Sequence, residues 1–393
     1  MQKQVRLNSR LHSMDALRAI TMFLGVVLHA AMSYQLHPRS GWPQDSHSAN
    51  IVYDFVYQWI HSFRMPLFFL IAGFFTRFLY LKIGHASFLK HRIKRILIPF
   101  LVGLVLIVPI TAFPFHFYNY FISNEESFKT SISLAVQASV RWNGVIHLWF
   151  LYYLIIFYSI FLGIKWLLEK TKFKALNNNF TFLPTTINII VLSVLLFVIQ
   201  FLFLDVKVEP WTGIKIKWSL ILYYGLFYFV GYAMQRNINS LQVCNFVYKY
   251  YLIIGTCLSI VNFYLIYTNT YDIAFFGFFN ITVLKAFTAI QTNLLLFGML
   301  GFFMTAFEKE QKLLRYFSDA SYWVYLIHLP IVVGLQVLFL EVNYFDHFKF
   351  GIILLLTTII TLVTYHAFVR YSIIGIYLHG ERQKEVLIQS IKF

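Results

Sequence analysis

The chain has 393 residues, of which 59% are hydrophobic, 20% aromatic and only 12% charged, and its formal net charge is +16. Soluble domains carry about twice this share of charged residues, so the composition excludes a soluble globular protein and indicates an all-α, polytopic membrane protein. The positive charge suits cytoplasmic loops and anionic lipid headgroups, and we therefore expect no nucleic-acid partner. Cys244 and Cys257 do not resemble a disulfide framework or a metal knuckle.

Apolar segments of about 20 residues, the length needed to cross a bilayer, predict about ten transmembrane helices. The expected spans are residues 14–36, 51–80, 95–113, 146–168, 185–204, 217–234, 246–268, 283–305, 320–341 and 350–372. We expect residues 1–375 to form one transmembrane domain and residues 376–393 to form a cytoplasmic tail.

The distribution of lysine and arginine gives the expected orientation of these helices. The N-terminus carries Lys3, Arg6 and Arg10, and the loop after the second span holds a dense run of basic residues. The loops on the opposite side hold far fewer. The positive-inside rule therefore predicts that both termini lie in the cytoplasm.

The first expected span carries ionisable residues along one stripe. Arg18 and His29 are eleven residues apart, which brings them to nearly the same helix face, about 16 Å apart along the axis. Asp15 precedes Arg18 by three residues and is expected to pair with it. Ionisable groups within a bilayer normally face the protein interior or a water-filled path. The alternative for this segment is a cleaved signal peptide, although Arg18 would interrupt its apolar region.

The second expected span has a polar face near its start and a basic residue deeper inside. Asp54, Gln58 and His61 follow one another at helical spacing, and Arg64 comes just before Pro66, which we expect to kink the helix. Charged or titratable groups beside a kink are hard to reconcile with a lipid-facing surface. We therefore expect this face to point into the protein.

The third expected span begins with two arginines on its cytoplasmic side. Arg92 and Arg95 are three residues apart, with Lys94 between them. This spacing is typical of an ordinary positive-inside anchor. Guanidinium geometry also suits a clamp for anionic phosphates, so both interpretations stay open on spacing alone.

Two later spans each carry a histidine beside an aromatic residue. His147 and Trp149 open the fourth span, and Tyr325 and His328 are neighbours in the ninth. A tryptophan at this depth is often an interface anchor, and a Tyr–His pair three residues apart is often a structural hydrogen-bonded pair. Histidines from several spans could together bind a metal, but no cysteine or carboxylate cluster accompanies them, so we expect no metal.

Taken together, the motifs resemble the acyltransferase-3 family of integral membrane proteins. That family's basic residue, ten residues and histidine correspond to Arg18 and His29, and its R-x-x-R motif corresponds to Arg92 and Arg95. Four further sequence segments also resemble the family, namely residues 15–19, 64–69, 147–151 and 321–328. Residues 61–65 look closest to the glucan-biosynthesis protein C branch, which is associated with succinyl transfer to periplasmic glucans.

This resemblance implies a multi-pass O-acyltransferase of the bacterial cytoplasmic (inner) membrane. Such an enzyme would move an acyl group from cytoplasmic acyl-CoA, either succinyl-CoA or acetyl-CoA, to a hydroxyl of an extracytoplasmic glycan. A periplasmic glucan is the expected carbohydrate acceptor, and no permanently bound cofactor is expected. The alternative is a transporter or flippase of a sugar or lipid-linked glycan, because buried arginines and histidines serve such proteins too.

The resemblance also implies roles for the candidate site residues. His29 would act as general base, or would carry the acyl group as an acyl-imidazole, with Arg18 and Asp15 on the same stripe. Arg92 and Arg95 would bind the acyl-CoA phosphates. The candidates for the oxyanion, acyl or acceptor site are His61, Arg64, Tyr325, His328, His147 and Trp149.

Overall fold

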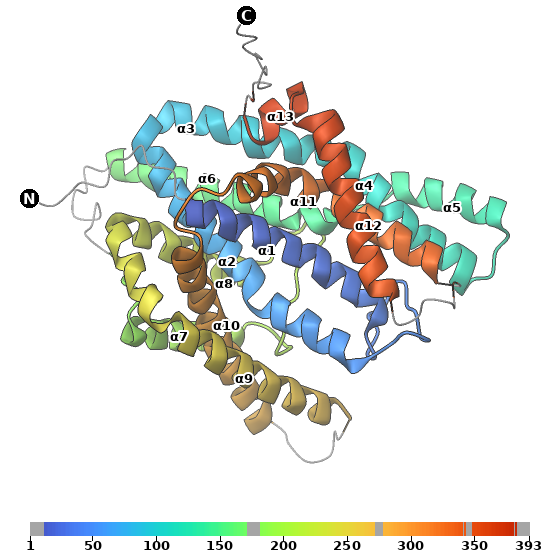
Figure 1. The fold of residues 1–393 in the computed structure, drawn as a ribbon, viewed down its shortest axis with the longest axis horizontal. Coiled ribbons are helices and arrows are strands. Elements are labelled where there is room, and N and C mark those ends of the chain that lie inside the picture. The colour runs from blue at the N-terminus through green and yellow to red at the C-terminus, as the bar shows by residue number, and fades with distance from the viewer. Residues whose placement is uncertain are drawn as a thin grey trace, which may run out of the picture.

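The computed structural model describes residues 12–170, 181–271, 278–340, 342, 348–380 and 382. Within these residues the fold is helical and contains no strand (Figure 1). The α-helices are α1 (His12–Ala31), α2 (Ile51–Ile83), α3 (His85–Arg92), α4 (Ile98–Tyr118), α5 (Phe128–Val140), α6 (Trp149–Lys170), α7 (Thr186–Gln200), α8 (Trp218–Met234), α9 (Cys244–Tyr271), α10 (Phe278–Ala306), α11 (Lys312–Phe339), α12 (Lys349–Thr364) and α13 (Ile373–Leu378).

Eight helical stretches among the described residues are long and apolar enough to cross a membrane. They correspond to eight of the ten expected spans. The other two, residues 185–204 and 217–234, are helices α7 and α8, of 15 and 17 residues. Helix α7 is shorter than the range of about 17–25 residues that a crossing requires, and α8 is at the lower end of that range. The expected all-α membrane class is confirmed, and the orientation of the termini stays a prediction.

Helix α1 packs against both α2 and α11 near the middle of the bundle (Figure 1). Helices α1 and α11 run in the same direction. Near their starts, Arg18 Nη2 donates to Ser318 Oγ at 2.9 Å. Near their ends, Gln336 Nε2 donates to the carbonyl oxygens of His29 and Ala30 at 2.9 and 3.1 Å. Side chains at matching heights on the two helices therefore meet.

Helix α2 is a continuous helix of 33 residues. Asn50 caps its first turn by accepting a hydrogen bond from the Val52 N–H, and Gly84 follows its last turn with a φ of 75°, which favours glycine. The helix continues through Pro66 rather than ending there. One element therefore carries both the polar residues near its start and residues that line the cavity described below.

Helices α2 and α8 touch along their backbones. A Cβ at Gly73 would overlap the carbonyl oxygen of Tyr228, and a Cβ at Gly231 would overlap that of Leu70. Small residues allow such close approach between membrane helices. The two contacts are reciprocal and fix how α2 sits against the bundle.

Candidate active site

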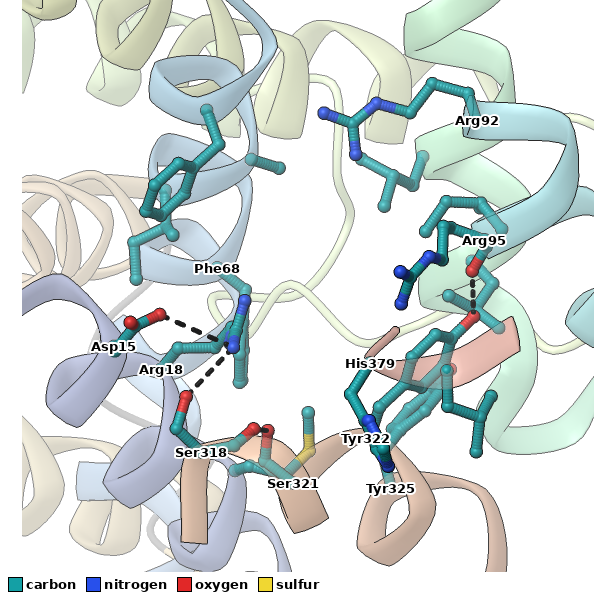
Figure 2. A pocket seen from close by; sticks show the side chains of 18 of the residues that line it. Asp15, Arg18, Phe68, Arg92, Arg95, Ser318, Ser321, Tyr322, Tyr325 and His379 are labelled. Atoms are coloured by element: carbon teal, nitrogen blue, oxygen red, sulfur yellow. Dashed lines mark hydrogen bonds and ion pairs between the residues drawn. The ribbon is translucent and has the colours of Figure 1, made fainter. Parts of the chain in front are cut away.

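A cavity of about 590 Å³ lies between α1, α2, α6, α11 and the helical turns that precede α4 (Figure 2). Its charged and polar lining comprises Asp15, Arg18, His91, Arg92, Arg95, Tyr158, Ser318, Asp319, Ser321, Tyr322, Tyr325, His379 and Arg382. Phenylalanine and aliphatic side chains of α2 and α6 complete the wall. The four arginines outnumber the two aspartates, so the cavity carries net positive charge.

Arg18 is held on one side of this cavity by α1 and α11. Its Nη2 lies 3.5 Å from Asp15 Oδ1, so the ion pair expected from their spacing is present. The same nitrogen donates to Ser318 Oγ (Figure 2). The charge of Arg18 is thus partly neutralised before any ligand binds.

Arg92 and Arg95 point into the cavity from the opposite side (Figure 2). Arg95 lies in a π-helical turn, Ile93–Leu97, which joins α3 to α4, and such turns often occur at functional sites. The guanidinium carbon of Arg92 lies 4.9 Å from the Phe88 ring centre and 4.7 Å from that of Tyr158. Within the described chain, neither arginine forms an ion pair with a carboxylate. Their positive charge is available to an anionic ligand.

Three imidazoles, hereafter the histidine cluster, meet beyond the inner end of the cavity. They are His29 at the end of α1, His147 in the turn before α6, and His328 in α11. The ring centres of His29 and His328 are 5.3 Å apart, and those of His147 and His328 are 5.8 Å apart. Residues far apart in sequence thus form one group of titratable side chains.

Hydrogen bonds fix the proton positions on two of these rings. His328 Nδ1 lies 3.0 and 2.9 Å from the carbonyl oxygens of Val324 and Tyr325, so it must carry a hydrogen and donate. His147 Nε2 donates in the same way to the Leu326 carbonyl at 3.0 Å. His328 Nε2 and His147 Nδ1 are buried without a hydrogen-bond partner in the described chain, as is His29 Nδ1. Each of these two rings therefore donates through one nitrogen and leaves the other nitrogen free for a hydrogen bond with a ligand or a neighbouring side chain.

Tyr325 joins the cavity to the histidine cluster. Its ring lines the cavity and lies 5.7 Å from the His147 ring and 6.5 Å from the His328 ring. Its hydroxyl donates to the His147 carbonyl at 2.7 Å, so it is not hydrogen-bonded to His328. His29 is absent from the cavity lining. The cavity that Arg92, Arg95 and Arg18 line therefore ends at Tyr325, and the Tyr325 ring separates it from the histidine cluster.

Trp42 and Gln336 support His29. The indole ring of Trp42 is stacked on the His29 imidazole, with ring centres 5.7 Å apart and an angle of 11° between the planes. Trp42 Nε1 donates to Gln336 Oε1 at 3.2 Å, and Gln336 also donates to the carbonyl oxygens at the end of α1. The His29 ring is thereby positioned by a stacking partner and a buried amide.

Arg64 lies inside the bundle on α2, against α1. A Cβ at Gly25 would overlap Arg64 Nη1, and Gly25 precedes His29 by four residues, about one turn. Arg64 Nε is buried without a hydrogen-bond partner, and Arg64 forms no ion pair with a described carboxylate. A guanidinium at this depth without a counter-ion is costly, which marks Arg64 as a candidate ligand for an anion.

His61 belongs to a separate hydrogen-bond network in the N-terminal part of α2. Its Nε2 lies 3.1 Å from the Val208 carbonyl and 4.0 Å from Glu209 Oε2. Arg39 donates two hydrogen bonds to Glu209, at 2.9 and 2.6 Å, and the Tyr57 hydroxyl donates a third at 3.2 Å. Burial alone would raise the pKa of Glu209, but the His61 imidazole and the Arg39 guanidinium outweigh it and lower that pKa to about 2. Glu209 therefore stays ionised and ties the loop before α8 to α2.

Comparison with known proteins identifies the family. The model of the acyltransferase domain matches residues 11–366, which is nearly the whole chain. The chain belongs to the acyltransferase-3 family. It is similar to glucans biosynthesis protein C of Salmonella paratyphi B and Salmonella enteritidis, with 27% identity over 222 residues. These residues are 56% of the chain and span about half, 54%, of each relative. No solved structure matches the chain.

The family's two motifs occupy different parts of this chain. Arg18, Arg92 and Arg95 line the cavity, whereas His29 lies beyond Tyr325 in the histidine cluster. Trp149 is not part of that cluster, because it packs instead in an aromatic group with Phe69 and Tyr224. Their roles in catalysis stay predictions.

Sequence reasoning missed several residues of this site. Trp42, Gln336 and Glu209 lie outside the acyltransferase-3 motifs, and no periodic pattern marks them. His379 and Arg382 lie in the expected cytoplasmic tail, residues 376–393, and both line the cavity. A basic residue close after the last apolar span was the only available signal for Arg382.

Proposed function

We propose that this membrane acyltransferase moves an acyl group from cytoplasmic acyl-CoA to a hydroxyl of an extracytoplasmic glycan. The observation that carries the proposal is the cavity itself, which leads from Arg92 and Arg95, neither of them paired with a carboxylate in the described chain, to Tyr325 at the edge of the histidine cluster. An anionic donor would bind at the first end and react at the second. The relatives named glucans biosynthesis protein C support a glucan as acceptor.

The dimensions of the donor fit this arrangement. The phosphates of acyl-CoA would bind Arg92 and Arg95, and the extended pantetheine arm, about 15–20 Å long, would carry the thioester inward. Helix α1 rises about 16 Å between Arg18 and His29. An arm of this length is comparable with that rise and would carry the thioester to the depth of the histidine cluster, so the nucleotide need not cross the membrane.

The transfer needs a base for the acceptor hydroxyl. His29 is the proposed base because its side chain retains accessible surface, whereas His147 and His328 are buried. As the hydroxyl oxygen attacks the thioester carbonyl, His29 takes its proton; the C–S bond then breaks, and the proton ends on the released CoA thiol. The His328 ring, whose centre is 5.3 Å from that of His29, would accept a hydrogen bond from one His29 nitrogen and leave the other nitrogen free to act as the base. In the alternative acyl-imidazole route, His29 would be the nucleophile.

Arg64 favours a donor whose acyl group ends in a free carboxylate, as succinyl does. Its guanidinium has no carboxylate partner in the described structure and lies beside the turn that carries His29. A substrate carboxylate would supply the missing counter-ion and remove the cost of the isolated charge. With an acetyl donor, the same side chain would instead stabilise the thioester oxyanion.

The test is acylation of purified glucan by the full chain in liposomes, with acyl-CoA supplied and the glucan analysed by mass spectrometry. Wild-type protein should add one acyl unit, and His29→Ala should lower the rate roughly 100-fold or more. His47→Ala is the matched control, since His47 is an exposed histidine on the loop after α1. Normal activity of folded His29→Ala protein would remove His29 from catalysis. Movement of intact glycan across the membrane without an acylated product would instead support the alternative function, a transporter or flippase.

A further inference from the structure

The chain after α12 returns to the arginine-rich end of the cavity. Leu378, His379 and Arg382 line it together with Arg92 and Arg95. Figure 2 shows His379 beside Tyr322, below the two arginines. Leu378, His379 and Arg382 lie within the segment, residues 376–393, that is expected to form the cytoplasmic tail.

Specific contacts hold this C-terminal wall in place. Arg382 Nη2 lies 2.6 Å from Asp319 Oδ1 on α11. Gly380 has a φ of 103°, and a Cβ there would lie 2.8 Å from Arg95 Nη2, so the chain passes directly beside that guanidinium. Leu378 is buried beneath it. The segment therefore brings Arg382 to the same end of the cavity as Arg95.

The charges at this end do not balance. Arg18 is paired with Asp15, and Arg382 is paired with Asp319. Among the described residues, Arg92 and Arg95 have no carboxylate partner, so this part of the rim holds two more positive than negative charges. Like charges brought together in a partly buried site repel one another, and a ligand with several negative charges relieves that repulsion. The ligand chemistry that suits this rim is a polyphosphate rather than a single carboxylate.

We propose that Arg382 is a third phosphate ligand of the donor, and that it exchanges Asp319 for a phosphate group when the donor binds. The proposal rests on the proposed function, in which the donor is acyl-CoA. A guanidinium binds phosphate oxygens through paired hydrogen bonds, as it binds a carboxylate. In the unliganded protein Asp319 occupies that position, and after the exchange Arg382 closes the C-terminal wall over the nucleotide end of the donor.

A purely structural ion pair makes a different prediction. If Arg382 and Asp319 only hold the segment in place, then removing either partner breaks the same contact and weakens donor binding to the same extent. If Arg382 binds phosphate, Asp319 competes with the ligand. Removing Asp319 then leaves affinity unchanged or increases it, while removing Arg382 lowers it.

The experiment measures binding of CoA, 3′-dephospho-CoA and pantetheine to the full chain in lipid nanodiscs by calorimetry. Arg382→Gln should weaken CoA binding roughly 10-fold or more and leave pantetheine binding unchanged, because pantetheine lacks phosphates. Asp319→Asn should bind CoA at least as tightly as wild type. Arg315→Gln is the matched control: Arg315 forms a 2.7 Å pair with Glu310 and does not line this cavity.

Each outcome decides the proposal. Equal loss of CoA affinity in Arg382→Gln and Asp319→Asn would identify a structural clamp and overturn it. Unchanged CoA binding in Arg382→Gln, with wild-type protein binding normally, would overturn it while leaving the proposed function intact. If wild-type protein does not bind CoA, the acyl-CoA donor fails and this inference fails with it.

Discussion

Arg64 on α2 and Gly25 on α1 are packed so closely that a Cβ at position 25 would overlap the Arg64 guanidinium. The position of a cation on one helix therefore depends on the absence of a side chain on its neighbour. Because His29 follows Gly25 by about one turn, this contact also sets the distance between the cation and the proposed base.

Gly25→Ala is expected to lower acyl transfer about 100-fold by displacing Arg64, since a shift of about 1 Å in a catalytic group can cost that much. The measurement is the transfer rate, with thermal unfolding recorded to establish that the variant is folded. Gly163→Ala is the control, because a Cβ at Gly163 on α6 would meet no atom within 4 Å. Equal activity of the two variants would show that the position of Arg64 does not affect the transfer rate.

Arg64→Met should abolish succinyl transfer and yet maintain or raise the thermal unfolding midpoint. Replacing an unpaired interior charge by an apolar side chain removes its desolvation cost. The loss should be larger with succinyl-CoA than with acetyl-CoA as donor. Arg77→Met, on the same helix, is the comparison: Arg77 donates to the Tyr232 hydroxyl at 3.3 Å and lies outside the cavity lining. An unchanged ratio of succinyl to acetyl transfer in Arg64→Met would argue against carboxylate binding.

Tyr325→Phe keeps the ring between cavity and histidine cluster but removes its hydrogen bond to the His147 carbonyl. Losing such a bond is worth about 0.5–1.5 kcal/mol, so we expect a transfer rate roughly 3- to 10-fold lower. Tyr325→Ala removes the ring as well and should increase hydrolysis of acyl-CoA without an acceptor. Tyr152→Phe is the control, since the Tyr152 hydroxyl donates to a carbonyl, that of Ile214, away from the site. Low hydrolysis in Tyr325→Ala would show that this ring does not shield the thioester.

Glu209 should make the protein less stable in acid. Its pKa is about 2 in the folded protein, against about 4.3 for glutamate in an unfolded chain. A depressed pKa stabilises the fold above the unfolded value, and this stabilisation is lost as the pH falls from about 4.3 toward 2. The difference in unfolding midpoint between wild type and Glu209→Gln should therefore be largest near neutral pH and shrink below pH 4.3. A difference that does not depend on pH would contradict this assignment.

The buried pair of Lys349 and Asp45 ties α12 to the loop after α1, with Nζ and Oδ2 2.6 Å apart and side-chain exposures of 0% and 2%. Lys349→Met should destabilise the protein by about 3–5 kcal/mol because it leaves a buried carboxylate unpaired. Adding Asp45→Asn should recover much of that loss. Arg315→Met, which breaks an exposed pair, should cost less than about 1 kcal/mol. Failure of the double variant to recover stability would point to packing rather than charge.

Local patterns predicted most of the fold and the residues of one helix face. Hydropathy located the helices because burial in lipid requires apolar runs, and the spacing of Asp15 and Arg18 predicted their ion pair. The lengths of helices α7 and α8 were harder to predict. Their amino-acid composition resembles that of a full transmembrane span, but the structure gives them only 15 and 17 residues.

Contacts between distant helices could not be predicted in this way. Tyr325 donates to a carbonyl 178 positions away in the chain, and the place of Arg64 depends on Gly25. Such contacts arise from how the helices pack, which periodicity along one helix does not encode. The same reason explains why the shared helix face of Arg18 and His29 did not reveal that Tyr325 lies between the cavity and His29.

The reciprocal glycine contacts between α2 and α8 would limit which donors the proposed transferase accepts. Gly73 and Gly231 bring the backbones of α2 and α8 into contact. Helix α2, which carries Phe68 and Ala72 on the cavity wall, therefore cannot move toward α8 to enlarge the cavity. Extra room for a bulkier acyl chain has to come from the opposite helices, where Tyr325 stands. Chain-length preference would then be set by that aromatic side chain, and engineering the enzyme toward longer donors would begin there.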